Sequence, residues 1–365
     1  MQPIDYGMFI MPFHYNDKSL AQCLDEDLEL IVKAEELGFS EFWVGEHHAI
    51  KCEFMMPEIF IGRAIGETSR IRLGPAPICL PQHHPARAAN QLAFLDHLSK
   101  GRLNLAFGPG SAMCDLELFG LSPKNAPEMT EEAMNIILQL WSTDPPYEVN
   151  GKYWQFSLTE NIDAVTTFGQ LQKPLQQPHP PIAMPATSRN SPTMRLAGRR
   201  GYEGISNCLV PGNVIANMWQ TYHAAANEVG RVADPSKLKI AKAIFLADTT
   251  KDAERIAREN SLGQNFKYIC RVFDQGFGRK MFKRDLDMSD QDCDLDYLFS
   301  EQIIAASPDD ALKRLLDLVE EAGPFGTLIL MSYDWDDKAG WIRSMELFAH
   351  ELMPSLNKAL GSAAA

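Results

Sequence analysis

The sequence lacks the patterns that mark several common classes of protein. Its seven cysteines are odd in number and scattered, and no two of them form a CxxC pair. Neither a zinc ribbon nor a disulfide framework is therefore predicted. Basic runs are also missing, and the formal net charge is −14. Because nucleic-acid binding generally needs a basic face, we exclude a nucleic-acid partner.

Long apolar runs are missing as well. No run approaches the roughly 20 residues of a membrane-spanning helix. The first six residues, Met1 to Tyr6, have neither the basic region nor the apolar region of a signal peptide. We therefore expect a reduced, cytoplasmic protein that does not associate with a membrane.

The composition is that of a globular protein with a sizeable core. The chain has 365 residues, of which 45% are hydrophobic and 22% are charged. This length suits two or three domains, or one α/β barrel of about 250 residues with insertions.

Strand and helix signals alternate along the chain. The strong helix starts include Ser19 with Gln22, a capping box, and Ser307-Pro308 followed by two acidic residues. The expected strands are 5–10, 42–45, 71–80, 103–107, 182–186, 202–206, 238–247 and 326–332. The last helix is expected at 341–356. Eight strand–helix units favour a closed barrel over an open doubly wound sheet.

The predicted fold class is therefore α/β, a single (β/α)8 TIM barrel that covers residues 1–365. Two segments interrupt the alternation. Residues 142–180 are rich in Pro, Gln and Tyr, which indicates an insertion. Residues 262–300 are charged and weakly periodic, and we predict that they form a lid loop, since barrels use long loops to close their sites.

Four turns follow the carboxyl ends of predicted strands, where barrel enzymes carry their functional residues. They are 45–48, 80–85, 108–111 and 186–191. Two of them contain a His-His pair, but adjacent residues on a strand point to opposite faces. No HxH or HExxH motif occurs, and no carboxylate stands at ligand spacing. We therefore predict no metal.

Each of the two histidine pairs allows a structural and a functional interpretation. His83 and His84 are expected to hydrogen-bond to backbone near the start of a helix. For the pair His47-His48, an inward imidazole at a barrel mouth favours a functional role over a structural one.

The other two turns suit a flat or anionic ligand. Gly108-Pro109-Gly110 is not a dinucleotide fingerprint, because Met113 stands where the third glycine would be. Its glycines still allow a ligand to approach the backbone closely. The turn that contains Ala186, Thr187, Ser188, Arg189 and Ser191 is either a phosphate seat or simply a helix cap.

Over nearly its whole length the chain resembles the bacterial luciferase-like, flavin-dependent monooxygenases, and within them the limonene and diketocamphane monooxygenase branch. The matching segments are 7–12, Glu46-His47-His48, Leu80-Pro81, 84–87, 95–102, 108–110, 190–198, 346–348 and Met353-Pro354.

The resemblance implies an enzyme that uses reduced FMN (FMNH2) and O2. A flavin C4a-(hydro)peroxide would insert one oxygen atom into a small apolar organic substrate, such as a terpenoid or a cyclic ketone. A separate NAD(P)H:flavin reductase would supply the FMNH2, and the chain would form a homodimer. His47 takes the place of the active-site histidine, with a role in proton management. The alternatives are a deazaflavin-dependent dehydrogenase and a non-catalytic flavin-binding barrel.

The resemblance also implies where the flavin lies and where this chain departs from the family. The Ala76–Pro77 peptide is expected to be cis and to lie beside the flavin, as a cis bond does in the aligned strand of luciferase. Gly108 and Pro109 replace a cysteine and a phosphate-binding arginine, so Arg189 would have to supply the charge. An apolar substrate pocket is expected from Phe13, His14, Tyr15, Phe54, Met55, Met56 and Met113.

Overall fold

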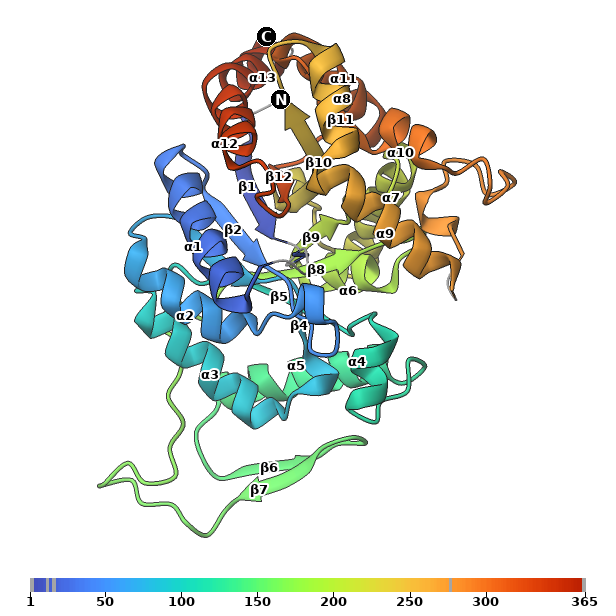
Figure 1. Cartoon of the computed structure of the whole chain (residues 1–365). Helices are drawn as coiled ribbons and strands as arrows, with labels where there is room; N and C mark the ends of the chain where they lie inside the picture. Colours follow the sequence, from blue (N-terminus) through green and yellow to red (C-terminus); the bar gives the residue numbers. More distant parts are fainter. Residues whose placement is uncertain (1–2, 11–12, 15–17, 276–277, 363–365) are drawn as a thin grey trace. The chain divides into compact units, whose positions relative to one another are not determined.

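The computed structural model describes residues 3–10, 13–14, 18–275 and 278–362 (Figure 1). The chain forms two compact units. The first unit comprises Met1–Phe42 and Met184–Ala365, and the second comprises Trp43–Ala183. Strands β2 (Glu41–Val44) and β8 (Ile182–Ala186) carry the chain across the boundaries between the units.

The first unit is built on parallel strands. Strand β12 pairs with β1 on one side and β10 on the other, and β10 also pairs with β9 and β11. The strands are β1 (Asp5–Ile10), β9 (Glu203–Ser206), β10 (Leu238–Leu246), β11 (Ile303–Ala306) and β12 (Thr327–Ser332). The helices are α1 (Leu20–Glu36), α6 (Pro192–Arg200), α7 (Gly212–Glu228), α8 (Thr250–Glu259), α9 (Ser261–Asp274), α10 (Leu295–Glu301), α11 (Pro308–Ala322), α12 (Lys338–Leu347) and α13 (Met353–Ser362).

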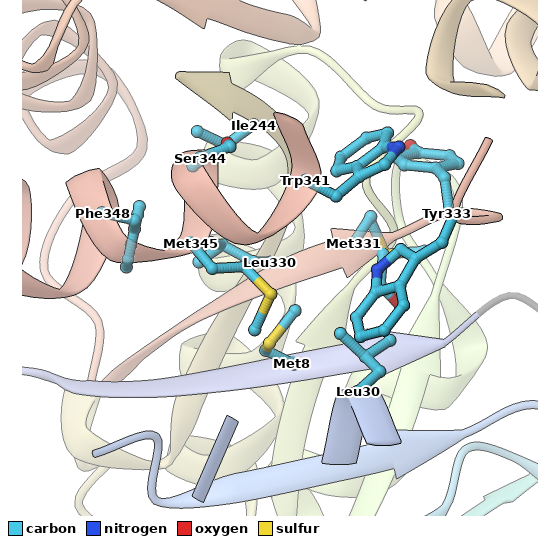
Figure 2. Close-up of a pocket in the computed structure, with 12 residues that line it drawn as sticks. Met8, Leu30, Ile244, Leu330, Met331, Tyr333, Trp341, Ser344, Met345 and Phe348 are labelled. Atoms are coloured by element: carbon cyan, nitrogen blue, oxygen red, sulfur yellow. The ribbon is translucent and has the colours of Figure 1, made fainter. Parts of the chain in front are cut away.

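The core of this unit lies on both faces of its strands. All nine residues of β10 are buried, as expected for a parallel strand that is covered on both sides. Figure 2 shows a small apolar cavity in the helix-facing layer, lined among others by Met8 of β1, Leu30 of α1, Ile244 of β10 and Met345 of α12. These side chains pack the strands against α1 and α12.

A buried ion pair ties β2 to β10 within the same unit. The Lys239 Nζ lies 2.6 Å from Glu41 Oε2 and 3.2 Å from Glu203 Oε2. Gly7 leaves the room that this pair needs, because a Cβ there would lie 2.8 Å from the Glu41 Cγ. Removing one partner of such a pair leaves the other charge buried and unpaired, which typically lowers the stability by about 3–5 kcal/mol.

The second unit contains three further parallel strands and an antiparallel hairpin. Strand β5 pairs with β4 and β8, while β6 and β7 pair only with each other. The strands are β3 (Arg72–Pro75), β4 (Ile78–Cys79), β5 (Leu105–Gly108), β6 (Tyr147–Asn150) and β7 (Gln155–Leu158). The helices are α2 (Pro57–Glu67), α3 (Pro85–Leu98), α4 (Met113–Leu118) and α5 (Ala126–Ser142).

The hairpin lies in the segment 142–180, which the sequence predicts to be an insertion. Its turn is fixed to α5, since the Glu132 carboxylate accepts hydrogen bonds from the backbone N–H groups of Lys152, Tyr153 and Trp154.

The eight predicted strands are all present. The predicted strand 71–80 is divided into β3 and β4 at Ala76–Pro77, and this peptide bond is cis, as predicted. The capping box at Ser19 and the helix cap at Ser307 are also confirmed.

Three features of the prediction are wrong. Residues 262–300 are not one long loop: their described part holds most of α9 and the greater part of α10, with β11 directly after them, and residues 276–277 lie outside the described residues. Polar residues on the exposed face of α9 concealed its apolar stripe, which is buried at Leu262, Phe266 and Ile269. Helix α4 was not foreseen. The C-terminal helix starts earlier, at Lys338, and a π-helical turn at Phe348–Leu352 separates α12 from α13. Among the described residues, no helix combines the length and apolar character that crossing a membrane requires.

Candidate active site

His47 stands directly after β2, with both imidazole nitrogens facing carboxylates. Its Nδ1 lies 3.4 Å from Asp115 Oδ2, and its Nε2 lies 3.7 Å from Glu53 Oε2. The backbone of His47 is fixed by a two-way pairing with Met55, in which each N–H donates to the other residue's carbonyl. The imidazole is 17% exposed. Carboxylates thus lie on both sides of the imidazole, while part of the ring stays accessible to solvent.

Asp115 of α4 holds the turn that carries His47. Its Oδ1 accepts hydrogen bonds from the backbone N–H groups of His48 (3.2 Å) and Ala49 (2.6 Å). Burial alone would raise the pKa of Asp115, but the hydrogen bonds from His47, Ala49 and His48 outweigh burial and lower it. The carboxylate is therefore ionised at neutral pH.

Glu46 lies at the centre of a second cluster. Its fully buried side chain accepts hydrogen bonds at Oε1 from His48 Nε2 (2.9 Å) and His83 Nε2 (2.6 Å), and at Oε2 from the Cys79 N–H (2.6 Å). Burial opposes ionisation, yet these hydrogen bonds lower the pKa of Glu46 to about 2. The same carboxylate raises the pKa of His48, and it raises that of His83 against the opposing effect of burial.

This cluster corrects two expectations from the sequence. A carboxylate does stand at ligand spacing, because Glu46, His48 and His83 bring their polar atoms within 4.8 Å of one another. The imidazole of His83, expected to bond to backbone, hydrogen-bonds to the Glu46 carboxylate. Glu46 and His83 are 37 residues apart in the sequence, and only the fold of the second unit brings them together. Asp115 was also missed, since a lone acid on a six-residue helix carries no recognisable pattern.

The glycine turn after β5 lies beside the same cluster. Gly110 has a positive φ of 73°, and a Cβ there would lie 3.2 Å from Gln82 Nε2 and 3.3 Å from Cys79 Sγ. Gly108 pairs with Cys79 in the β4–β5 ladder, with Pro109 between the two glycines. The second unit thus brings the ends of β2, β4 and β5 together.

The predicted flavin-side residues Ala76 and Pro77 stand at the break between β3 and β4. The Ala76 N–H donates to the Val44 carbonyl at 2.8 Å, two residues before Glu46. This places the cis peptide next to the β2 end, in the same unit as His47.

The remaining predicted site residues lie in the first unit, at the turn from β8 to α6. Ser191 caps α6 and is buried, and its Oγ hydrogen-bonds to Thr193 Oγ1 at 2.8 Å. Ala186 is buried at the end of β8, while Thr187 and Ser188 are exposed. Part of this turn is therefore a helix cap, and the exposed part leaves hydroxyl groups available to an anion.

Arg189 supplies a positive charge at the same turn. Its Nη2 donates to the backbone carbonyl of Arg284 at 2.8 Å, and that carbonyl also accepts from Asn213 Nδ2. Among the described residues, no carboxylate pairs with Arg189. The guanidinium keeps donors for an anion.

One residue of the expected apolar substrate pocket needs correction. His14 is not an apolar lining residue but the centre of a buried ion cluster, with Nδ1 2.7 Å from Asp334 Oδ1 and Nε2 3.1 Å from Asp27 Oδ2. Burial opposes its charge, but these two carboxylates raise the pKa of His14 to about 9. Met113 is exposed and Met55 is buried. Tyr15 lies outside the described residues.

The alternation of parallel strands and helices, with polar side chains at the strand ends, defines an α/β enzyme of the barrel type. The luciferase-like monooxygenase family matches residues 4–324. The chain therefore belongs to the luciferase-like monooxygenase family.

Individual relatives match nearly the whole chain. It is 28% identical to 3,6-diketocamphane 1,6-monooxygenase of Pseudomonas putida, over 97% of this chain and 98% of that protein. It is 29% identical to limonene 1,2-monooxygenase of Rhodococcus erythropolis, over 98% of this chain and 88% of that protein. The structure of the oxygenating constituent of 3,6-diketocamphane monooxygenase in complex with FMN superimposes with a TM-score of 0.87, covering 97% of this chain and 99% of that chain at 28% identity.

These comparisons confirm three predictions from the sequence. They confirm the family, the luciferase-like (β/α)8 barrel as the fold class, and a monooxygenase as the class of enzyme.

Proposed function

We propose that the chain is the oxygenase component of a two-component system, in which reduced FMN and O2 oxygenate a small apolar organic substrate. The observation that carries the proposal is His47, held between Asp115 and Glu53 at a strand end in a chain of this family. A separate NAD(P)H:flavin reductase would deliver the FMNH2. The related diketocamphane protein, an oxygenating constituent that binds FMN, supports both points.

The residues present are compatible with FMN. Gly108 and Gly110 carry no side chains, so a flat ring can approach the backbone of this turn closely. The Gln82 Oε1 atom next to it is buried without a hydrogen-bond partner among the described residues, so it has an acceptor to offer to a ring N–H. Ala76, Pro77, Gly108 and Pro109 line the neighbouring strand ends.

For the phosphate we assign the turn from β8 to α6. Arg189 supplies the charge, Thr187 and Ser188 supply hydroxyl groups, and the α6 N-terminus supplies backbone donors. Ala186 and Ser191 hold the two ends of this turn.

We assign proton transfer during the reaction to His47. Because Asp115 is ionised, it favours the tautomer that carries a proton on Nδ1, which leaves Nε2 as the atom that takes up or releases a proton. When bound, reduced FMN supplies the electrons with which O2 is split between the oxygenated product and water. The protein orients the reactants and excludes bulk water.

The segment 262–300 remains our proposal for a lid, although α9 and α10 give it more regular structure than the sequence suggests. Arg284 anchors it in the first unit through ion pairs with Glu301 (2.8 Å) and Glu321. The carbonyl of the same residue receives the hydrogen bond from Arg189. The proposed lid would thus be hydrogen-bonded to the turn that we assign to the phosphate.

A homodimer is the assembly that we propose. Ile59 of α2 and Phe94 of α3 are each 67% exposed, and these two helices pack side by side in the second unit. Two large apolar side chains at this exposure favour an interface with a second copy. Light scattering of Phe94→Glu against wild type tests it: a shift from dimer to monomer is expected, and an unchanged mass contradicts this interface.

The activity is tested by oxygen uptake with chemically reduced FMN against terpenes, cyclic ketones and long-chain aldehydes. Substrate-dependent uptake with an oxygenated product supports the proposal. Turnover only with a reduced deazaflavin would indicate a dehydrogenase, and flavin binding without turnover of any substrate would indicate a non-catalytic barrel. Either of these two results overturns the proposed oxygenase function.

A further inference from the structure

The Glu46 cluster has a donor set that the oxygenase chemistry does not require. Two imidazole nitrogens and one carboxylate oxygen converge there, at the ends of β2 and β4. We propose that Glu46, His48 and His83 form a binding site for Zn²⁺. The binding step does not depend on the proposed function, whereas its expected effect on turnover does.

The distances from the Glu46 carboxylate to the two imidazoles are close to those between two ligands of one metal ion. Glu46 Oε1 lies 2.9 Å from His48 Nε2 and 2.6 Å from His83 Nε2. Ligands at the usual zinc distances lie about 2.9 Å apart at a right angle and about 3.4 Å apart at the tetrahedral angle. The separations therefore have to grow by less than about 1 Å for the metal to replace the two shared protons.

The surroundings also resemble those of a zinc site. His83 Nδ1 lies 3.8 Å from Glu58 Oε1, so a carboxylate backs the nitrogen that would not bind the metal. The two imidazoles are 11% and 16% exposed, which gives the metal a route in, whereas the Glu46 side chain has no exposed surface.

Occupancy would change the neighbourhood of His47. The metal would hold Glu46 and His48, the residues on either side of His47 in the chain, in one geometry. It would also take the imidazoles of His48 and His83 out of proton exchange. We therefore expect Zn²⁺ to inhibit oxygenation, not to support it.

The test uses flavin-free full-length protein, so its outcome is independent of the activity. Calorimetric titration with Zn²⁺ is expected to give one site, which His48→Ala and His83→Ala weaken at least tenfold. His97→Ala is the matched control, because His97 is exposed in the same unit and its imidazole hydrogen-bonds to the Lys173 carbonyl and lies 3.2 Å from Gln172 Nε2. Absence of a single site, or equal affinity of the His83→Ala and His97→Ala variants, overturns the proposal.

A second measurement covers the case in which a variant does not fold. Crystals of the wild-type protein soaked in Zn²⁺ are expected to show an anomalous peak between Glu46 Oε1 and the Nε2 atoms of His48 and His83. Peaks found only elsewhere overturn the proposal without any mutation.

Discussion

His83 Nε2 donates to Glu46 Oε1 at 2.6 Å, across 37 residues of sequence. The bond joins the turn after β2 to the turn after β4, and it buries a carboxylate beside the residue that we assign to proton transfer. Because the carboxylate is out of reach of water, its charge must be balanced by the groups that contact it. Because the buried charge depends on these contacts, the stability of the turn that carries Glu46 is expected to be sensitive to pH and to substitution.

The free energy of unfolding is expected to be greatest in mildly acidic solution. The pKa of Glu46 is lowered to about 2 from 4.5, so its contribution is present above about pH 4.5 and is lost as the pH falls toward 2. His48 and His83 have pKa values raised above 6.5, so their contributions are present below about pH 6.5 and are lost as the pH rises through the folded-state values. The contributions overlap between about pH 4.5 and 6.5.

Urea unfolding at several pH values checks this dependence. Glu46→Gln is expected to flatten both limbs of the stability curve, since it removes the partner of both imidazoles. His97→Gln should leave the curve as it is in wild type. If Glu46→Gln and wild type give parallel curves, the cluster does not set the pH dependence.

His47→Ala is expected to leave the fold intact and to lower oxygenation. The loss of one general acid or base typically costs about 10²–10⁴-fold in rate. The measurement is turnover together with the ratio of product formed to O2 consumed. Unchanged turnover and coupling would make His47 structural.

Asp115→Asn separates positioning from proton transfer. The amide oxygen of Asn can still accept from His48 and Ala49, but without the charge it no longer favours the Nδ1-protonated tautomer of His47. We expect kcat to fall and its pH profile to shift, with little change in KM. A fall in thermal stability with an unchanged pH profile would point to a purely structural residue.

The fold was predictable because its signals are local. Capping residues such as Ser19 and Ser307, together with short apolar runs, fix where helices and strands begin. The cis peptide at Ala76–Pro77 was predictable from the resemblance, since two prolines interrupt a strand there.

Much of the candidate site was not predictable in this way. His83 meets Glu46, and Asp115 meets His47, only after strand ends distant in sequence are brought together. The ion cluster of His14 with Asp27 and Asp334 depends on contacts across 320 residues. From the sequence alone, His14 was predicted to line an apolar pocket.

Arg284→Ala is expected to loosen the proposed lid. It removes the ion pairs to Glu301 and Glu321 while the backbone carbonyl that meets Arg189 remains. We expect faster proteolysis within residues 283–294 and more hydrogen peroxide released per O2 consumed, because water reaches the site. Arg255→Ala, an exposed substitution on α8, serves as the control. Faster cleavage with unchanged coupling would show that the segment does not close the site.

Removal of metal ions is expected to leave the oxygenase active. If Zn²⁺ binds at Glu46 and blocks His48 and His83, a chelator should keep turnover the same or raise it. The check is oxygen uptake before and after dialysis against a chelator, with Zn²⁺ then added back. Loss of activity on chelation, restored by Zn²⁺, would show instead that a metal takes part in the reaction.

Arg189→Ala is expected to weaken the binding of FMN but not of riboflavin. A hydrogen bond to a charged group contributes about 1.5–3 kcal/mol, so its loss should raise the Kd for FMN about 10–100-fold. Riboflavin has the same ring system and lacks the phosphate, so its Kd should stay within about twofold of the wild-type value. Arg195→Ala is the matched control, since Arg195 lies on α6, the helix that directly follows the Arg189 turn, and is paired with Glu228 at 3.0 Å. Fluorescence titration of the three proteins with both flavins gives the comparison. Equal losses for FMN and riboflavin would place Arg189 against the ring or in the fold, and equal losses in both arginine variants would reduce its role to general surface charge.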